Sequence, residues 1–431
     1  MKTEQLYRIF KEESTGASTD SRTIKKGQLF FALWGQNFNG NKYAAEALDK
    51  GASYAVIDDP VYENDKTILV DDCLIELMAL AAHHRKMIKA PVLAITGTNG
   101  KTTTKELIAA IISKKLNVHF TKGNLNNEIG LPLTILSAPE NTEMMILEMG
   151  ANHLGEIRSL CNVARPDYGI ITNVGTAHLE GFGSFEGALK AKTELYEHLR
   201  KVNGIAIYND KNPFLTERIF KLVNRGVPYS NPTGVELAVE ALPSEMNLAV
   251  RVRYQHKTYD IQTGLFGSYN LENIIAAIAT GLFLGVEMDE IGEAISKYEP
   301  GNNRSQIKTT QNNTLVCDSY NANPTSMMLA LKAFFELKTT RRVLILGDML
   351  ELGDKSEEEH LKLLEALQSL KPEKVLLAGS TFQKISQQYG YKSFQDVASL
   401  REYLKAEPIK GSFVLIKGSR GMTLEKIYDL L

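Results

Sequence analysis

The sequence is poor in cysteine and lacks any long hydrophobic run, and each of these absences excludes a class of protein. Its 431 residues include three cysteines, Cys73, Cys161 and Cys317, which are far apart and form no CxxC motif. Disulfide frameworks and zinc sites need cysteines in pairs, so we expect neither, and a reducing compartment fits this composition. The segment MKTEQLYRIFKEEST lacks the apolar core of a signal peptide, and the most apolar long run, residues 274–286, is too short to span a bilayer. We therefore expect a cytoplasmic protein without a membrane partner.

An excess of charge of either sign is also absent. Lysine and arginine number 49 and aspartate and glutamate number 51, which gives a net charge of −2. Proteins that bind nucleic acid carry clustered positive charge, so this balance gives no support for nucleic acid as a partner, although it leaves room for a local basic pocket. The hydrophobic fraction of 43% is typical of a globular protein, and the length suggests two to four domains.

Alternating strand and helix patterns predict an α/β fold that begins with a small unit over residues 1–88. Strand-like runs occupy residues 28–35, 53–58 and 67–72, and a helical pattern follows at residues 74–87. A unit of this length is a common domain size.

A longer series of strands and helices follows. Runs rich in β-branched or long apolar residues at 92–96, 144–150, 168–174 and 204–210 alternate with helical patterns, which indicates a mostly parallel sheet. Residues 247–264 alternate between apolar and polar types instead, so we expect an antiparallel hairpin attached to that sheet.

The segment EPGNNRS near residue 300 is rich in turn-forming residues and reads as a linker. Four strand-like runs after it, again with helical patterns between them, predict a third α/β unit. We therefore expect three domains, over residues 1–88, 89–303 and 304–431.

The strongest local signal is AITGTNGKTTTKEL, residues 94–107, in which a strand runs into a glycine-rich turn that opens a helix. Gly97 and Gly100 allow main-chain NH groups to surround phosphate oxygens, and the helix N-terminus adds partial positive charge. Lys101 can reach the β- and γ-phosphates, and the Thr102 hydroxyl can ligate Mg²⁺. The usual first glycine of such a loop is replaced by Ile95, and a tight βα turn without a ligand is the alternative interpretation.

Two side chains at strand ends indicate a metal site. Glu148 ends the run MMILEMG, and His178 follows the run YGIITNV. Groups at the carboxyl ends of parallel strands converge on the ligand crevice, where a carboxylate and an imidazole could hold Mg²⁺. Imidazole is an unusual Mg²⁺ ligand, so the alternatives are a hydrogen-bonded structural histidine and an exposed loop carboxylate.

Several motifs occur in order along the chain: TGTNGKTTT, EMGANHLGEI, ITNVGTAHLEGFGS, ALKAKTEL and DSYNANPTSM. Together they resemble the Mur ligase family, which includes the folylpolyglutamate synthetases, and the resemblance extends from Asp20 to near Gly421. DSYNANP at residues 318–324 and GDMLELG at residues 347–353 resemble the branch of the family that adds D-Ala-D-Ala. The DNPR motif of the relative that adds diaminopimelate or lysine is missing.

The resemblance implies a three-domain architecture with a central phosphate-loop domain on a mostly parallel sheet and a Rossmann-like C-terminal domain. The implied ATP-dependent, peptide bond-forming ligase joins D-Ala-D-Ala to UDP-MurNAc-tripeptide through an acyl phosphate and releases ADP and phosphate. Because a carboxylate is a poor electrophile, phosphoryl transfer creates a good leaving group, and Mg²⁺ and Lys101 offset the repulsion between anions. Such an enzyme serves peptidoglycan synthesis, and thereby cell wall biogenesis, cell shape and cell division, and we expect a monomer.

The resemblance also implies the metal site and the catalytic set. One Mg²⁺ would lie near Thr102 and Glu148, and a second near Glu148 and His178. Lys192 matches the lysine that the family carries as a carbamate, which is an anionic oxygen donor, whereas an ammonium cannot ligate a cation. Without the resemblance Lys192 would be read as a solvated helix lysine. The implied catalytic residues are Lys101, His178, Lys192 and Arg304.

For ATP, the resemblance implies that Asn270 and Asn273 contact adenine, that Asp318 binds ribose, and that Arg304 reaches the γ-phosphate on domain closure. Helix capping is the alternative for Asn270. The remaining implied ATP contacts come from the glycine-rich loop: Gly97, Thr98, Asn99, Gly100, Lys101, Thr102 and Thr103.

For the UDP-precursor, the resemblance implies three groups of contacts. Asp20, Ser21 and Arg22 match the DSR element of the first domain, and the family's later DGH element is replaced here by Asn39-Gly40-Asn41. The segment TKGNLNNEIGLP matches a precursor-binding loop, for which a plain polar loop is the alternative. In DSYNANP the alternative is a turn before Pro324, which would also select asparagine. The implied substrate residues of these two segments are Thr121, Asn124, Asn126, Asn127, Tyr320, Asn321 and Asn323.

Three other functions share part of this pattern. A kinase or motor ATPase would share the phosphate loop, but would not explain Lys192 or DSYNANP. A nucleotide-gated binding protein that had lost catalysis would have no need of the whole catalytic set. A related Mur-type ligase could add another amino acid or glutamate.

Overall fold

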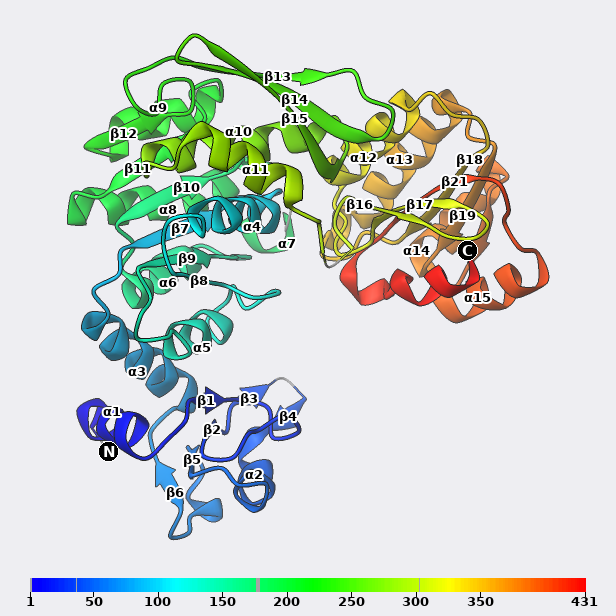
Figure 1. Ribbon diagram of the computed structural model, residues 1–431. Coiled ribbons are helices and arrows are strands. Elements are labelled where there is room, and N and C mark those ends of the chain that lie inside the picture. The colour runs from blue at the N-terminus through cyan, green and yellow to red at the C-terminus, as the bar shows by residue number, and fades with distance from the viewer. Residues whose placement is uncertain (1, 36, 176–178, 302) are drawn as a thin grey trace.

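The computed structural model describes residues 2–35, 37–175, 179–301 and 303–431, and its sheets follow one another along the chain (Figure 1). The N-terminal sheet has four parallel strands in the order β1-β2-β5-β6. Its strands are β1 (Ala17–Ser18), β2 (Leu29–Phe31), β5 (Tyr54–Ile57) and β6 (Thr67–Leu69), with a hairpin of β3 (Trp34–Gly35) and β4 (Phe38–Asn39) after β2. Its helices are α1 (Thr3–Glu12), α2 (Ala44–Asp49) and α3 (Cys73–Met87).

The central sheet has six parallel strands in the order β12-β11-β10-β7-β9-β8. They are β7 (Val92–Thr96), β8 (Val118–Phe120), β9 (Met144–Glu148), β10 (Tyr168–Ile171), β11 (Ile205–Tyr208) and β12 (Arg225–Pro228). The helices of this part are α4 (Lys101–Ile112), α5 (Gly130–Leu136), α6 (Glu156–Ala164), α7 (Leu179–Phe182), α8 (Phe185–Val202), α9 (Pro213–Leu222), α10 (Leu271–Phe283) and α11 (Met288–Lys297).

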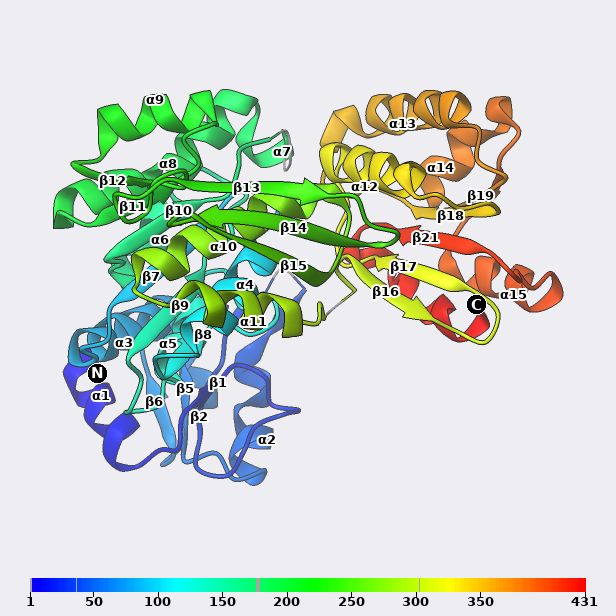
Figure 2. The same cartoon turned by 45° about the horizontal axis from the view of Figure 1, so that its top comes forward.

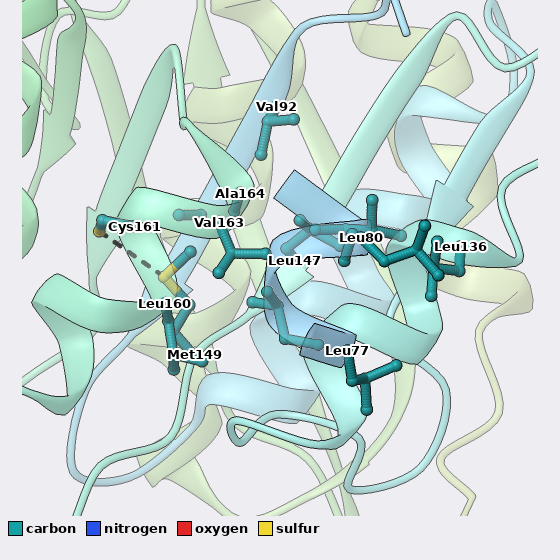
Figure 3. Packing of buried hydrophobic residues seen from close by; sticks show 14 of the residues in the cluster. Leu77, Leu80, Val92, Leu136, Leu147, Met149, Leu160, Cys161, Val163 and Ala164 are labelled. Carbon is teal, nitrogen blue, oxygen red and sulfur yellow. Dashed lines mark hydrogen bonds between the residues drawn. The ribbon is translucent and has the colours of Figure 1, made fainter. Parts of the chain in front are cut away.

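Alternate residues of β7 face two different cores, which is why the whole strand is apolar. Val92 and Ala94 belong to the core formed with α3, α5, α6 and α8, whereas Leu93 and Ile95 belong to the core formed with α4, α10 and α11. The first of these cores is continuous with the core of the N-terminal sheet, and Leu77 and Leu80 of α3 belong to it. Figure 3 shows these two side chains close to Leu136 and Leu147 of the central part.

An antiparallel sheet lies beside α10 and α11 and reaches toward the C-terminal part of the chain (Figure 2). Its strands are β13 (Leu237–Leu242), β14 (Asn247–Tyr254) and β15 (Lys257–Phe266). The expected hairpin over residues 247–264 is therefore confirmed, and β13 is a third strand that the sequence did not reveal. Phe266, at the end of β15, is buried in the C-terminal core beside Met327 and Phe334.

The C-terminal sheet has six strands in the order β16-β17-β21-β18-β19-β20, in which only β16 is antiparallel. They are β16 (Gln306–Thr309), β17 (Thr314–Asp318), β18 (Arg342–Gly347), β19 (Lys374–Ala378), β20 (Lys392–Phe394) and β21 (Phe413–Lys417). Helices α12 (Pro324–Glu336) and α13 (Ser356–Leu370) pack into the core of one face, and α15 (Val397–Ala406) packs into the core of the other, with α14 (Ser380–Ile385) after β19. The expected α/β fold with a central parallel sheet is thus confirmed.

Short edge strands are the main elements that the sequence did not indicate. Strands β8, β12 and β20 have three or four residues each and are largely half-buried or exposed. Their sequences lack a continuous apolar run, because an edge strand buries less of its surface than a central one. Among the described residues, none of the helices has the length and apolar character that crossing a bilayer requires.

Candidate functional site

The glycine-rich loop lies between the end of β7 and the first turn of α4. Gly97 has φ of 149° and Gly100 has φ of 79°, a region that side chains other than glycine rarely adopt. A Cβ atom on Gly97 would lie 1.9 Å from Thr172 Oγ1, and one on Gly100 would lie 2.2 Å from Asn273 Oδ1. Both positions therefore require glycine for conformation and for space.

The segment that follows strand β10 holds this loop in shape. Thr98 N donates to Asn173 O over 3.0 Å, and Asn99 N donates to Asn173 Oδ1 over 2.9 Å. The Thr172 hydroxyl donates to Asn99 O over 2.6 Å, and Gly175 N donates to Thr98 Oγ1 over 2.9 Å. Main-chain and side-chain hydrogen bonds from residues 172–175 therefore fix the conformation of the loop.

Lys101 lies over the loop. Its Nζ donates to Gly97 O over 2.7 Å and to Thr98 O over 3.1 Å. Burial lowers the pKa of the Lys101 ammonium, while the carboxylate of Glu148 acts in the opposite direction. The Lys101 ammonium is thus bonded to the carbonyl oxygens of the loop itself, and its contact with phosphate oxygens stays a prediction.

Glu148 lies at the centre of the predicted metal site. Its Oε1 accepts hydrogen bonds from Thr102 Oγ1 over 3.1 Å and from Asn126 Nδ2 over 2.8 Å. Its Oε2 is buried without a hydrogen bond and lies 3.6 Å from Lys105 Nζ, which is also buried without a hydrogen bond. Thr121 Oγ1 accepts from the main-chain NH of Glu148 over 3.0 Å.

This donor set fits a divalent cation. Glu148 Oε2 makes no hydrogen bond and has Lys105 Nζ at 3.6 Å, while Oε1 accepts from the Thr102 hydroxyl. A carboxylate and a hydroxyl are oxygen donors of the kind that Mg²⁺ prefers. His178 lies outside the described residues. In the part of the chain that the structure describes, no group of three or more His, Cys, Asp and Glu side chains could hold a metal ion. The cation would therefore depend on other oxygen donors in addition to Glu148.

Lys192 is not a solvated lysine, so the interpretation from residue type alone is wrong. It lies on α8 with 2% of its surface exposed, and its Nζ is 5.0 Å from the centre of the Phe182 ring. Burial, and then the charge of Lys101, lower the pKa of Lys192 to about 7. An amine with this pKa is largely uncharged just above neutral pH, which is the form that reacts with carbon dioxide.

Asn270 and Asn273 are buried side by side beneath the loop. Asn273 Nδ2 donates to Asn270 Oδ1 over 2.8 Å, and Asn270 Nδ2 donates to Phe266 O over 2.8 Å. Thr104 Oγ1 donates to Asn273 Oδ1 over 3.1 Å. The Asn270 side chain makes no capping hydrogen bond to α10, so the capping alternative is wrong.

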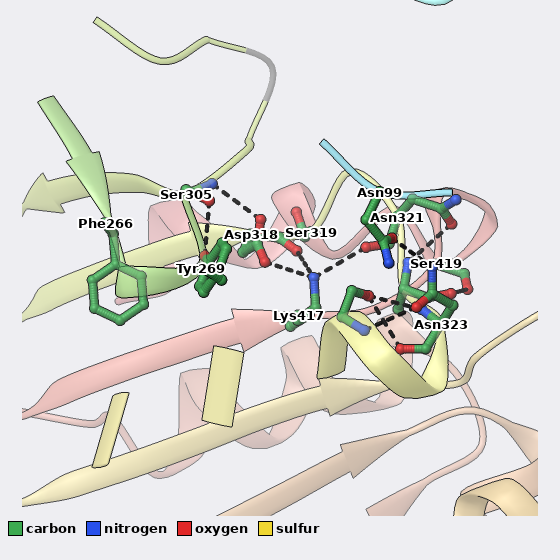
Figure 4. Close-up of polar contacts among 12 residues, drawn as sticks. Asn99, Phe266, Tyr269, Ser305, Asp318, Ser319, Asn321, Asn323, Lys417 and Ser419 are labelled. Carbon is green, nitrogen blue, oxygen red and sulfur yellow. Dashed lines mark hydrogen bonds and ion pairs between the residues drawn. The ribbon is translucent and has the colours of Figure 1, made fainter. Parts of the chain in front are cut away.

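The turn after β17 lies against the glycine-rich loop, as Figure 4 shows. Asn323 Nδ2 donates to Asn99 Oδ1 over 2.8 Å. The Arg304 guanidinium stacks on the Tyr320 ring at 3.7 Å from its centre. Asp318 accepts from Ser305 N over 3.0 Å through Oδ1, while the Asn321 side chain accepts from Ala322 N over 2.9 Å. Of the predicted residues of this turn, Asn323 therefore contacts the glycine-rich loop directly, and Tyr320 contacts Arg304.

Two buried lysines were missed by the sequence analysis. Lys417 pairs with Asp318 over 2.6 Å, and Lys105 faces Glu148. Lys105 follows Thr102 by about one helical turn, so its spacing was a usable signal. Nothing in the sequence around Lys417 distinguishes it from an ordinary strand-end lysine.

The predicted precursor residues fall into separate groups. Arg22 forms a two-point ion pair with Asp20 over 2.8 and 2.9 Å, and Arg22 holds the pKa of that carboxyl at about 2, while Ser21 between them is buried. In the second segment, Asn126 and Thr121 contact Glu148, whereas Asn124 is exposed and Asn127 Oδ1 accepts from Gly130 N at the start of α5.

The Asn39-Gly40-Asn41 departure has a structural use of its own. Asn41 is wholly buried, and its Nδ2 donates to Asn39 Oδ1 over 2.9 Å and to Asp58 Oδ1 over 2.8 Å. Asp58 also accepts from Trp34 Nε1 over 2.8 Å and from Cys73 N over 3.1 Å. These asparagines therefore shape the carboxyl edge of the N-terminal sheet.

Comparison with known proteins covers almost the whole chain. Residues 13–110 match the "Mur ligase family, catalytic domain", residues 95–281 the "Mur ligase middle domain" and residues 303–420 the "Mur ligase, glutamate ligase domain". The UDP-N-acetylmuramoyl-tripeptide–D-alanyl-D-alanine ligase of Bacillus subtilis is 34% identical over 425 residues, which cover 96% of this chain and 92% of the relative. The ligase of the same name from Escherichia coli is 34% identical, with 99% of this chain and 97% of the relative covered.

Solved structures show the same similarity over almost the whole chain. A crystal structure of MurF from Acinetobacter baumannii superposes with a TM-score of 0.86 at 28% identity, covering 99% of this chain and 98% of the other. The MurF ligase of Thermotoga maritima in complex with ADP superposes with a TM-score of 0.82 at 27% identity, covering 96% of each chain. On matches of this length and identity, the chain belongs to the Mur ligase family.

Proposed function

We propose that this chain is an ATP-dependent ligase that joins D-Ala-D-Ala to UDP-MurNAc-tripeptide in peptidoglycan precursor synthesis. The observation that carries the proposal is the placement of Lys101 and Thr102 in the first turn of α4, where Lys101 bonds the glycine-rich loop and Thr102 bonds Glu148. Full-length similarity to ligases named for this reaction supports the choice of substrates. We propose further that the enzyme acts in the cytoplasm as a monomer.

In this proposal the glycine loop grips the triphosphate, and Lys101 leaves the loop carbonyls to contact the β- and γ-phosphates. Arg304, Asp318, Asn270 and Asn273 complete the ATP site. A Mg²⁺ ion held by the Thr102 hydroxyl and the Glu148 carboxylate would offset the repulsion between the triphosphate and the substrate carboxylate. The donors His178 and Lys192, the latter as a carbamate, belong to the same proposed site.

The proposed roles follow three consecutive parts of the chain. Residues 1–88 take the UDP end of the precursor through Asp20, Ser21 and Arg22, and residues 89–303 take ATP. The loop residues Thr121, Asn124, Asn126 and Asn127 lead from one to the other. Residues 304–431 carry Tyr320, Asn321 and Asn323 to the loop and exclude water from the acyl phosphate, which would otherwise hydrolyse.

The test is direct. The protein is incubated with ATP, Mg²⁺, UDP-MurNAc-tripeptide and D-Ala-D-Ala, and the product is weighed by mass spectrometry alongside an assay for ADP. We expect a product heavier by one dipeptide less one water, and ADP release that requires both acceptor and precursor. Precursors that end in diaminopimelate and in lysine are offered separately, as are single amino acids and glutamate in place of the dipeptide. Release of ADP without formation of a new amide, or ligation of a single amino acid but not of the dipeptide, would contradict the proposal.

A further inference from the structure

Lys417 lies at the junction between the linker and the C-terminal sheet. It is the last residue of β21, and its direct partner across the parallel ladder is Asp318, the last residue of β17. Lys417 is 2% exposed, so its ammonium is withdrawn from water. Its Nζ donates to Asp318 Oδ2 over 2.6 Å and to the main-chain oxygens of Asp318 and Asn321 over 3.4 and 3.2 Å (Figure 4). An ammonium has three protons to donate, and here one turn of the chain accepts all of them.

Asp318 joins this lysine to the linker. Its second carboxylate oxygen, Oδ1, accepts from Ser305 N over 3.0 Å. The Ser305 hydroxyl in turn shares a hydrogen bond of 2.8 Å with Tyr269 OH, which belongs to the segment between β15 and α10. One carboxylate therefore connects the C-terminal sheet to the chain segment on which Arg304 lies.

The turn that Lys417 contacts includes residues that lie against the glycine-rich loop and against Arg304. Tyr320 supports the Arg304 guanidinium at 3.7 Å, and Asn323 donates to Asn99 in the glycine loop. Displacement of the turn would move Asp318, Tyr320 and Asn323 together, since all three lie within six residues of chain.

Stability alone is a weak reason for such a pair. Removing two charges from water costs several kcal/mol per ion, and well-packed apolar residues often stabilise a core equally well. The pair instead specifies one geometry, because a point charge and a carboxylate that are both buried tolerate little displacement.

We infer that Lys417 is a positioning residue of the nucleotide site, which acts through Asp318 and holds the turn of residues 318–323 against the glycine loop. This inference rests on the proposed use of ATP, but its test does not need ligation. In this inference Lys417 does not contact the nucleotide itself. Its contribution is that the Asp318 carboxylate and the neighbouring side chains are already in place when the nucleotide binds.

The experiment is a double-mutant cycle on nucleotide affinity. The dissociation constant of ADP with Mg²⁺ is measured by calorimetry for the full-length wild type, Lys417→Gln, Asp318→Asn and the double variant, and the KM for ATP is measured alongside kcat. Loss of a charged hydrogen bond corresponds to a roughly tenfold or larger weakening. We expect Lys417→Gln to weaken ADP binding by about this factor and to raise the KM for ATP more than it lowers kcat.

The cycle distinguishes an effect of Lys417 through Asp318 from an independent effect of Lys417 on the structure. If Lys417 acts through Asp318, then Lys417→Gln has little further effect in the Asp318→Asn background, so the two effects are not additive. The double variant also replaces the ion pair by two amides that can bond each other, which protects against simple unfolding. Thermal unfolding of every variant is recorded, and affinities are compared only below the transition.

Lys374→Gln is the matched control. Lys374 begins β19 at the opposite end of the same sheet and contacts the Tyr403 ring at 5.1 Å, far from the turn in sequence and in ladder position. We expect its ADP affinity to equal that of the wild type. An unchanged ADP affinity in Lys417→Gln, or an equal loss in the wild-type and Asp318→Asn backgrounds, would overturn the inference. Wild-type ADP binding without ligation would reject the proposed function while leaving this inference open to the same cycle.

Discussion

The side chain of Asn323 makes two contacts with opposite ends of its amide group. Its Oδ1 accepts from Ser326 N over 2.9 Å and caps helix α12, and its Nδ2 donates to Asn99 Oδ1 in the glycine loop over 2.8 Å. Asn99 lies 224 residues from Asn323 in the chain, whereas Ser326 lies only three residues from it. One residue therefore serves a local helix start and a contact between distant parts of the molecule.

This double role can be separated by substitution. Asn323→Asp keeps an acceptor for the cap but replaces the donor to Asn99 by a negative charge beside the phosphate site. We expect the KM for ATP to rise by about tenfold or more, with a melting temperature close to that of the wild type. Asn323→Ala, the comparison variant, loses the cap as well and should lose about 1 kcal/mol of stability. An Asn323→Asp enzyme with normal KM would show that the contact with Asn99 is irrelevant to nucleotide binding.

Glu148→Gln tests the proposed metal carboxylate. Glutamine keeps an oxygen for Thr102 and Asn126 but removes the negative charge, so we expect kcat to fall by about 100-fold or more while the protein stays folded. Glu106→Gln is a suitable control, because Glu106 Oε1 also lies near Lys105, at 3.7 Å, but bonds Tyr298 through its other oxygen. Activity in Glu148→Gln comparable to that of Glu106→Gln would argue against the metal role.

Lys192→Ala should abolish ligation and leave the fold and ADP binding intact, because it deletes a donor of the proposed metal site. Added short carboxylates should restore part of the rate by occupying the space of the carbamate. Lys190→Ala, two residues earlier on the exposed side of α8, should behave as the wild type. Full turnover by Lys192→Ala without any added carboxylate would refute the carbamate role.

Lys192 should also leave a signature in the pH dependence of stability. Its folded pKa of about 7 lies below the ordinary lysine value of 10.5, so between these two values the unfolded chain binds a proton that the folded chain does not. The free energy of unfolding therefore rises with pH across this window by up to about 1.4 kcal/mol per unit, and below pH 7 the cost of burying the ammonium is fully present. Denaturant titrations at pH 7.5 and 8.5 in buffers free of carbon dioxide should show a steeper rise for the wild type than for Lys192→Met. Equal slopes would contradict a buried, uncharged amine.

The linker near residues 299–305 should act as a hinge. Ser305 has φ of 48° and Asn303 has φ of 55°, a conformation that is sparsely populated and is often found where a chain must bend. We expect solution scattering to report a smaller radius of gyration when nucleotide and precursor are added together than when neither is present. A radius that does not change would count against domain closure at this segment.

Local sequence was sufficient where the structure depends on neighbouring residues. The apolar run of residues 92–96 located β7, and the glycines at 97 and 100 located the turn before α4. Residues other than glycine rarely adopt those backbone angles, and a side chain there would collide with Thr172 and Asn273. The motifs of the Mur ligase resemblance likewise lie on short segments, so they can be recognised in the sequence without knowledge of the fold.

Only the tertiary structure shows which charged side chains are buried away from water, because no local sequence pattern indicates it. Lys192, Lys105 and Lys417 are each almost fully buried, yet each lies in an ordinary helical or strand-end context. Their environment comes from residues distant in the chain, such as Glu148 for Lys105 and Asp318 for Lys417. A lysine's desolvation and its partner depend on how sheets and helices pack together, so the buried charges at this site followed only from the folded arrangement.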